Sequence, residues 1–166
     1  MKHLKVLTVV SSTFLMLASG IASAQLMNRA EPLPGITSAG QPDEAALAAI
    51  AKEGFAAVID LRGVNEDRGM EEQKVVESLG MRYVAIPVEG AAGVTYEKAK
   101  ALDDIIAEID GPVLVHCASG NRVGGVLALR EHMNGMPADQ AFELGVEAGM
   151  SSASVKDTVK EQLEKR

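Results

Sequence analysis

Short apolar runs of strand length alternate with amphipathic stretches of helical length through most of this 166-residue chain. The apolar runs predict strands at 55–61, 82–88 and 112–117, preceded by a short extended stretch at 35–40. Apolar residues at helical spacing predict helices at 43–53, 70–80, 95–109, 122–133, 137–148 and 152–165. Strands that alternate with helices form parallel sheets. The sequence therefore predicts an α/β fold with a mostly parallel central sheet and helices on both faces.

The most apolar of the predicted strands ends at the only cysteine of the chain. Pro112 stands at its first position, where no ladder hydrogen bond is lost, and Cys117 stands at its end. Ligands of such sheets bind beyond the carboxyl ends of the strands. This strand therefore places Cys117 at the edge where a binding site is expected.

The first 24 residues have the pattern of a secretory signal peptide. MKHLK is a short basic start, an apolar core follows, and Ala22–Ala24 supplies the small residues that signal peptidase requires. We expect cleavage between Ala24 and Gln25, a periplasmic or secreted protein, and a single domain over residues 25–166. No stable membrane anchor then remains. The competing interpretation is an uncleaved anchor, although the apolar run is shorter than the roughly 20 residues that span a bilayer.

The charge and the cysteine count limit the classes of partner. The formal net charge is −7, and loss of Lys2 and Lys5 with the signal peptide would make it −9. This balance argues against nucleic acid and anionic membranes as partners, whereas a small anion can still bind at a locally positive site. Exported proteins usually pair their cysteines in disulfides. Cys117 has no intramolecular partner, which favours a reactive thiol.

The segment CASGNR, which follows the strand at 112–117, combines features that suit an anion. A thiol at a strand end faces the N-terminus of the next helix, whose free N–H groups and dipole favour anions and a thiolate. Gly120 permits a positive φ, and Arg122 offers a planar pair of donors for two oxyanion oxygens. The alternative is a core strand ending at His116 and Cys117, a simple turn at Gly120 and a solvated Arg122.

VHCASGNR resembles the active-site loop of the cysteine-dependent phosphatases of the tyrosine and dual-specificity types. The stretches TSAGQP, AAVIDLRG, MRYVAIPVEG and PVLVHCASGNRVGG resemble the bacterial dual-specificity-like phosphatase family that also occurs beside beta-lactamase-hydrolase-like proteins. The resemblance covers residues 36–133 and implies a dual-specificity-phosphatase-like fold. It also implies hydrolysis of the phosphate monoester of a small molecule or a phosphoprotein, with no metal and no cofactor.

In the mechanism that this resemblance implies, the Cys117 thiolate attacks phosphorus, and water then hydrolyses the cysteinyl-phosphate. His116 would orient and stabilise the thiolate. Asp60 and Arg62 end another strand at the same expected edge, where they support the loop, contact substrate or form a structural ion pair. Ser119 and Asn121 could also serve simply as turn formers. The oxyanion would be held by the loop residues Ala118, Ser119, Gly120, Asn121 and Arg122.

The loop departs from the family in its length and in the residue after the arginine. Most such phosphatases have five residues between cysteine and arginine, whereas this chain has four, the length found in rhodanese-like sulfurtransferases. Val123 stands where most have a serine or threonine. In IPVEG, Gly90 falls at the usual position of the general acid, with Glu89 just before it as the candidate. A solvated surface glutamate is the alternative for Glu89.

Three functions stay open from the sequence. They are a phosphatase, a sulfurtransferase that forms a Cys117 persulfide, and a non-catalytic module that binds an oxyanion. The segment Glu66–Arg68 is expected to be a solvated loop. Nothing in the chain names the physiological substrate.

Overall fold

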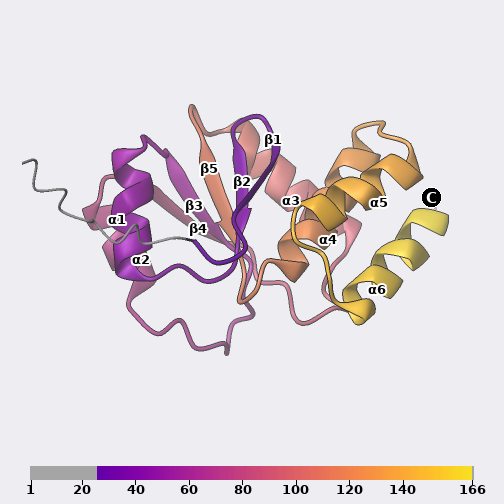
Figure 1. Cartoon of the computed structure of the whole chain (residues 1–166), viewed down its shortest axis with the longest axis horizontal. Coiled ribbons are helices and arrows are strands. Elements are labelled where there is room, and N and C mark those ends of the chain that lie inside the picture. Colours follow the sequence, from indigo (N-terminus) through magenta and orange to yellow (C-terminus); the bar gives the residue numbers. More distant parts are fainter. Residues whose placement is uncertain (1–25, 166) are drawn as a thin grey trace, which may run out of the picture.

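A computed structural model describes residues 26–165, and these form a five-stranded sheet flanked by helices (Figure 1). The strands lie in the order β1-β2-β5-β3-β4. β2, β5, β3 and β4 run parallel, whereas β1 pairs antiparallel with β2. The predicted mostly parallel sheet is confirmed. The strands are β1 (Ala30–Leu33), β2 (Ile36–Ala39), β3 (Ala57–Asp60), β4 (Arg82–Ala85) and β5 (Val113–His116).

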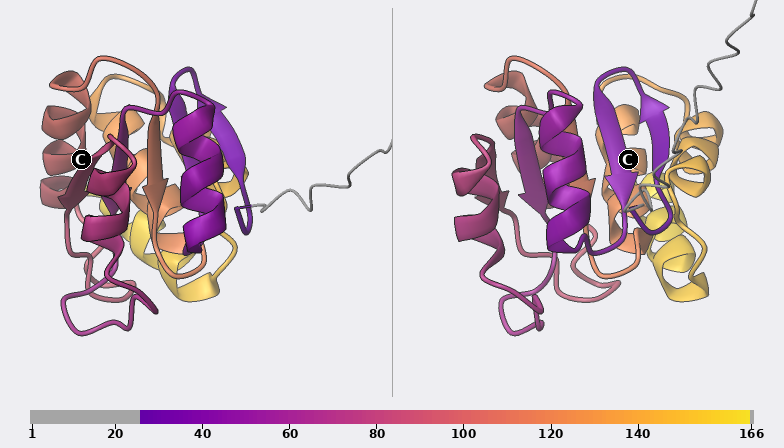
Figure 2. Two further views of the ribbon diagram at one scale, coloured as in Figure 1. Left: turned by 90° about the vertical axis from the view of Figure 1, so that its left-hand side faces the viewer. Right: turned by 60° about the vertical axis from the view of Figure 1, so that its left-hand side comes forward.

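Helices cover both faces of the sheet, as predicted. α1 (Glu44–Lys52) and α2 (Glu72–Ser78) lie on one face and come in front of the sheet in the left view of Figure 2. The helices on the other face are α3 (Tyr96–Ala107), α4 (Asn121–Met133), α5 (Ala138–Glu147) and α6 (Ala153–Glu164). Side-chain caps fix two of the starts: Asp43 accepts the N–H of Ala46, and Thr95 accepts that of Lys98.

The central strands are buried on both faces, so their side chains divide between two apolar clusters. In β5, Val113 and Val115 pack with α3 to α6, whereas Leu114 packs with α1 and α2. The alternation of side chains along a strand continues past this point. It sends the Cys117 side chain into the α3–α6 cluster and that of His116 to the opposite face.

The sequence-based boundaries differ from the structure mainly at the sheet edges. The strand β1 was not predicted, because AEPL lacks an alternating apolar pattern and contains a proline. β4 stops at Ala85, two residues before Pro87, and α4 begins at Asn121. The expected signal peptide lies outside the described residues. Within residues 26–165, no helix is long and apolar enough to cross a membrane.

Two glycines let α4 and α5 approach one another closely. A Cβ on Gly145 would lie 2.8 Å from the carbonyl oxygen of Gly124, and a Cβ on Gly124 would overlap the carbonyl oxygen of Gly145. No larger residue fits at either position without moving backbone. Because α4 begins directly after the loop that carries Cys117, this contact also helps to fix where that loop lies.

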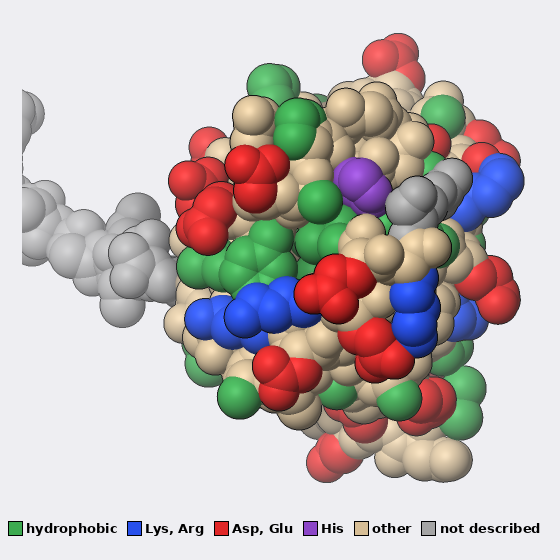
Figure 3. Space-filling view, turned by 90° about the vertical axis from the view of Figure 1, so that its right-hand side faces the viewer, with side chains coloured by type: hydrophobic (Ala, Val, Ile, Leu, Met, Phe, Trp, Pro, Cys, Tyr) green, Lys and Arg blue, Asp and Glu red, His purple; other side chains and the backbone are tan. Residues whose placement is uncertain are grey.

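The C-terminal helices carry a groove on their outer face. Figure 3 shows apolar surface on this side of the molecule, bordered by charged side chains. The groove has a volume of about 940 Å³ and lies between α5 and α6, with Phe142 and Leu163 among its apolar lining and Asp139, Glu143 and Glu147 among its carboxylates. None of its lining residues belongs to the loop that carries Cys117. The groove is therefore separate from the site described next.

Candidate active site

Cys117 lies at the point where β5 ends and the chain turns into α4. Its side chain is fully buried, and its Sγ accepts the backbone N–H of Gly120 at 3.1 Å. Gly120 is the N-cap of α4 and has φ +86°, a conformation that favours glycine. The thiol therefore lies against a helix N-terminus, where free N–H groups and the helix dipole favour an anion.

Contacts to the backbone carbonyls of Ala118 and Ser119 hold the loop from the N-terminal side of the chain. The N–H of Gln41 donates to the carbonyl of Ala118 at 3.2 Å, and the side-chain amide of Asn28 donates to the carbonyl of Ser119 at 3.1 Å. Both loop residues are exposed. Their carbonyl groups are thus directed toward the protein, while the residues themselves border solvent.

The Asn121 side chain braces the loop from the other side. Its Oδ1 accepts the backbone N–H groups of Ser151 at 2.8 Å and Ser152 at 2.6 Å, in the turn between α5 and α6. Its Nδ2 donates to the hydroxyl of Ser119 at 3.2 Å. The Asn121 side chain is therefore engaged within the protein, so the oxyanion contact expected for this residue stays an expectation for its backbone N–H alone, in the first turn of α4.

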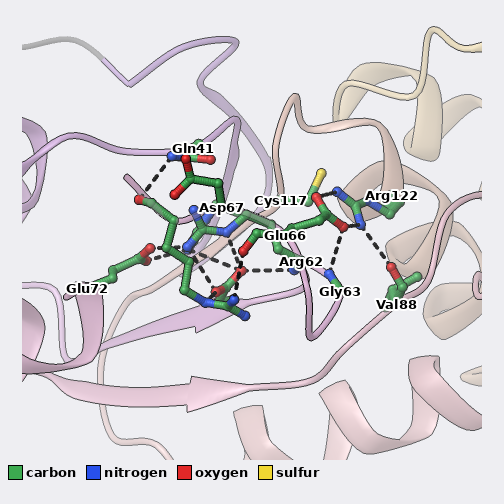
Figure 4. Close-up of polar contacts among 12 residues, drawn as sticks. Gln41, Arg62, Gly63, Glu66, Asp67, Glu72, Val88, Cys117 and Arg122 are labelled. Atoms are coloured by element: carbon green, nitrogen blue, oxygen red, sulfur yellow. Dashed lines mark hydrogen bonds and ion pairs between the residues drawn. The ribbon is translucent and has the colours of Figure 1, made fainter. Parts of the chain in front are cut away.

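Arg122 is nearly buried and is held by two other loops (Figure 4). Its Nη1 donates to the carbonyl of Val88 at 2.9 Å, and both Nη atoms contact the Glu66 carboxylate, Nη2 at 2.7 Å. The hydrogen bond to Glu66 is the main reason that the pKa of Arg122 is raised, and the neighbouring Cys117 raises it further. Figure 4 shows the thiol of Cys117 beside this guanidinium.

Glu66 is the site residue that sequence reasoning missed. The expectation of a solvated loop is wrong for Glu66, which pairs with Arg122, and for Arg68, whose Nε donates to Asp60 at 3.0 Å. The hydrogen bond from Arg122 lowers the pKa of Glu66, and the N–H of Gly63 lowers it further. A polar loop has no periodicity, and the partner lies 56 residues away in the chain. No sequence signal identifies such a pair.

Glu89 lies in the segment between β4 and α3, directly after the carbonyl that Arg122 contacts. Its side chain is exposed, and its Oε1 accepts the N–H of Val64 at 2.9 Å. Gly90, at the position where the family has its general acid, has φ +57°. The structure thus places the Glu89 carboxylate at the border of the site, held by the same segment that carries Glu66.

The three supporting candidates belong to a buried polar network on the opposite face of the sheet. Arg62 is fully buried and donates to both oxygens of Asp60 at 2.9 Å and to Glu72. His116 Nε2 lies 2.7 Å from the Glu72 carboxylate. Asp60 also accepts the hydroxyl of Tyr83 at 2.9 Å. The network braces the residue that precedes Cys117 from behind, and Asp60 and Arg62 are too deeply buried to contact substrate.

The charges in this network explain its ionisation. Burial alone would raise the pKa of Asp60, but the hydrogen bonds from Arg62 and the charges of His116 and Arg62 lower it to about 2. Asp60, Glu72 and His116 lie close enough together to be considered as metal ligands. Arg62 and Arg68, however, already place two guanidinium groups on these carboxylates. A divalent cation would lie beside them, so the residues fit an ion-pair network and not a metal centre.

Comparison with known proteins gives one family and several similar folds. The family model described as "DSP-PTPase phosphatase fused to NAD+ kinase" matches residues 22–162. A beta-lactamase hydrolase-like protein of Agrobacterium fabrum is 33% identical over 104 residues, which is 60% of this chain and 24% of that protein. The match therefore spans about a quarter of the length of that curated relative.

Two solved structures illustrate the similarity of fold. A crystal structure of a phosphatase-like protein from Neisseria meningitidis superposes with a TM-score of 0.69 and 20% identity over 82% of this chain and 99% of that one. The structure of TpbA from P. aeruginosa in complex with pTyr superposes with a TM-score of 0.60 and 18% identity, over 87% and 90% of the two chains. At these identities the likeness shows the fold alone, which is dual-specificity-phosphatase-like as predicted.

Proposed function

The chain belongs to the family of DSP-PTPase phosphatases fused to NAD+ kinase, and on that basis we propose that it hydrolyses phosphate monoesters without a metal, through a cysteinyl-phosphate on Cys117. The observation that carries this proposal is the pairing of a buried thiol with two sets of donors. The Sγ of Cys117 receives an N–H at the start of α4, and Arg122 lies beside it. One short loop thus provides a nucleophile and an oxyanion site.

In the first step, the Cys117 thiolate attacks phosphorus in line with the leaving oxygen. The S–P bond forms and the P–O bond breaks, and its electron pair stays on the leaving oxygen, which takes a proton from Glu89. The backbone N–H groups from Ala118 to Arg122 and the Arg122 guanidinium stabilise the negative charge on the other phosphate oxygens. The exposed position of Glu89 at the border of the site supports its role as this acid.

In the second step, water attacks the cysteinyl-phosphate, and the Glu89 carboxylate takes its proton. The S–P bond breaks, inorganic phosphate leaves, and the thiolate is regenerated. Three N–H donors of Arg122 go to Glu66 and Val88, and a guanidinium has five. The other two, on Nε and Nη2, form an adjacent pair that suits two phosphate oxygens.

The place of action is part of the proposal. The basic start, apolar core and small residues before Gln25 support export to the periplasm or the medium. A phosphorylated small molecule or a phosphoprotein in that compartment would be the substrate, and no membrane anchor would remain after cleavage. Expression of the full chain with detection of the mature N-terminus tests this directly: a start at Gln25 is expected, and retention of residues 1–24 would contradict it.

A matched pair of assays tests the chemistry. Wild-type protein and Cys117→Ser would be compared for release of phosphate from p-nitrophenyl phosphate and for formation of thiocyanate from thiosulfate and cyanide. Phosphate release that depends on Cys117 is the expected result. Thiocyanate formation that depends on Cys117, without phosphate release, would instead establish the sulfurtransferase that the four-residue spacing in the loop favours.

The role of Glu89 requires a test that separates proton donation from packing. Glu89→Gln should lower turnover of an alkyl phosphate by about a hundredfold or more, and that of p-nitrophenyl phosphate far less, since p-nitrophenolate leaves without a proton. Glu143→Gln, at an exposed position on α5, is the control and should change neither rate. Equal losses on both substrates would show that Glu89 does not act as the acid.

A further inference from the structure

The segments that surround the Cys117 loop form a rim, which we define as residues 26–28, 40–41, 61–69 and 86–90. A β-bridge and two hydrogen bonds connect them around the loop: Gly40 bridges to Ser119, the side chain of Gln41 donates to the carbonyl of Arg68, and the N–H of Val64 donates to Glu89. On this side of the loop, a group attached to a bound phosphate would lie against the rim, and the turn at Ser151 and Ser152 lies on the other side. The charges and apolar side chains of the rim therefore select which organic group the phosphate can be attached to. We call this group the carrier.

The basic residues of the rim and the loop are all engaged within the protein. By sequence these are Arg62, Arg68 and Arg122. Arg62 is fully buried on Asp60 and Glu72. Arg68 turns inward, with its Nε on Asp60 and its Nη1 on the carbonyl of Glu66. Arg122 is the arginine beside the thiol, so the rim offers no second arginine for another phosphate group.

The acidic residues of the rim are Glu66, Asp67 and Glu89. Asp67 and Glu89 are exposed, and Glu66 is partly exposed where it pairs with Arg122. Carboxylates at this border repel a carrier with further negative charge and accept a neutral or cationic one. The net charge of −7 for the whole chain acts in the same direction.

Two exposed apolar side chains belong to the same rim. Val64 is 63% exposed and Met27 is 52% exposed, and they are the two exposed large hydrophobic residues in the described part of the chain. Val64 lies between Glu89 and Glu66 in the segment that contacts Arg122. A Cβ added to Gly40 would lie 3.0 Å from the Met27 methyl and 3.2 Å from the carbonyl oxygen of Ala118, so Met27 lies near the side of the loop on which that carbonyl points.

From this combination we propose that Val64, Met27 and the rim carboxylates restrict the enzyme to a single phosphate on an apolar carrier without further negative charge. The inference rests on the proposed phosphatase function and specifies its substrate class. Val64 and Met27 cover the apolar part of the carrier, and the exposed Asp67 carboxylate excludes polyphosphorylated compounds. A lone phosphate then takes the place beside Cys117 and Arg122.

Three alkyl phosphates with primary-alcohol leaving groups provide matched probes. They are ethyl phosphate, hexyl phosphate and hexane-1,6-diol bisphosphate, which differ in apolar length or in the second phosphate while the leaving group stays similar. We expect kcat/KM for hexyl phosphate to exceed that for ethyl phosphate by about tenfold, the effect of burying roughly two methylene groups. The bisphosphate should be at least about tenfold poorer than hexyl phosphate.

Substitutions test whether the named residues cause these ratios of kcat/KM. Val64→Ser and Met27→Ser should each reduce the preference for hexyl over ethyl phosphate, and Asp67→Lys should raise kcat/KM for the bisphosphate relative to hexyl phosphate. Met136→Ser and Asp139→Lys, in the groove between α5 and α6, are the matched controls and should leave both ratios unchanged.

The outcomes separate this inference from the function on which it rests. If no phosphate ester is hydrolysed in a Cys117-dependent way, the proposed function is wrong. If the esters are hydrolysed but hexyl and ethyl phosphate are equal, or the bisphosphate is preferred, the phosphatase stands and the inferred substrate class is wrong. The inferred substrate class is also wrong if the wild-type ratios are as expected but Val64→Ser, Met27→Ser and Asp67→Lys leave these ratios unchanged.

Discussion

At the scale of single residues, the carboxylate of Glu66 sets the orientation of Arg122. The Glu66 carboxylate accepts hydrogen bonds from both Nη atoms of the guanidinium, and the carbonyl of Val88 accepts a second hydrogen bond from Nη1. The proposed mechanism assigns the other edge of the guanidinium, made by Nε and Nη2, to an oxyanion. Because the Arg122 hydrogen bond lowers the pKa of Glu66, this residue stays ionised at neutral pH and is poorly suited to donate a proton. We therefore infer that Glu66 is a positioning residue, and Glu89 stays the proposed acid.

Replacement of Glu66 by glutamine tests this positioning role. Loss of a hydrogen bond between charged groups costs about 1.5–3 kcal/mol, so Glu66→Gln should lower kcat/KM for p-nitrophenyl phosphate by about ten- to a hundredfold. Glu143→Gln, at an exposed position on α5 and outside the site, is the control and should change this rate little. A rise in the rate of Glu66→Gln would show that its carboxylate competes with phosphate for Arg122.

At the scale of secondary-structure elements, the sequence predicted much of the fold because its signals are local. The apolar spacing placed the helices within about two residues of their ends, and the structure adds the caps at Asp43 and Thr95. The strand β1 and the Glu66–Arg122 pair were missed because AEPL and VNEDR contain no periodic pattern. β1 pairs with the adjacent strand β2, whereas the partner of Glu66 lies 56 residues away in the chain.

The contact between α4 and α5 gives a prediction at this scale. A methyl group at Gly124 would clash with the carbonyl oxygen of Gly145 and with the backbone nitrogen and Cβ of Met150. A methyl group at Gly145 would clash with the carbonyl oxygen of Gly124 and with the Cβ of Ala128, but its third neighbour is the flexible end of the Met150 side chain. Both Gly124→Ala and Gly145→Ala should lower the free energy of unfolding by about 1–3 kcal/mol, with the larger loss at Gly124. Chemical denaturation measures both. Unchanged stability, or the reverse order, would contradict this account of the packing.

At the scale of the whole molecule, the sheet separates two different polar arrangements. The thiol side holds Cys117 and Arg122 among the helices α3 to α6, and the other side holds the ion-pair network under α1 and α2. His116 and Cys117 are adjacent in the chain, yet their side chains point to opposite faces of the sheet. The network therefore contributes to global stability as well as to the placement of the loop.

The stability of the whole fold should depend on this network in acid. The pKa of Asp60 is about 2 when folded, against an ordinary value of 3.8, so the unfolded chain binds more protons between these pH values. The free energy of unfolding should fall by about 2 kcal/mol from this residue as the pH drops from about 4 to about 2. Chemical denaturation at several pH values between about 2 and 4 measures this effect. The free energy of unfolding of Asp60→Asn should depend less steeply on pH than that of the wild type. Asp104→Asn, exposed on α3, should keep the wild-type slope, and parallel profiles for all three would exclude Asp60 as the source.

The complete burial of Cys117 affects how fast its thiol can be chemically modified. Since its side chain has no exposed surface, an alkylating reagent, like a phosphate ester, reaches the sulfur only while the surrounding loops are parted. The observed labelling rate is then the product of two quantities: the fraction of time that the loops are open and the intrinsic reactivity of the exposed thiol. In an oxidising compartment the same delay slows the reaction of the only cysteine with peroxide. How long the protein keeps a usable thiol would thus be set by the motion of its loops.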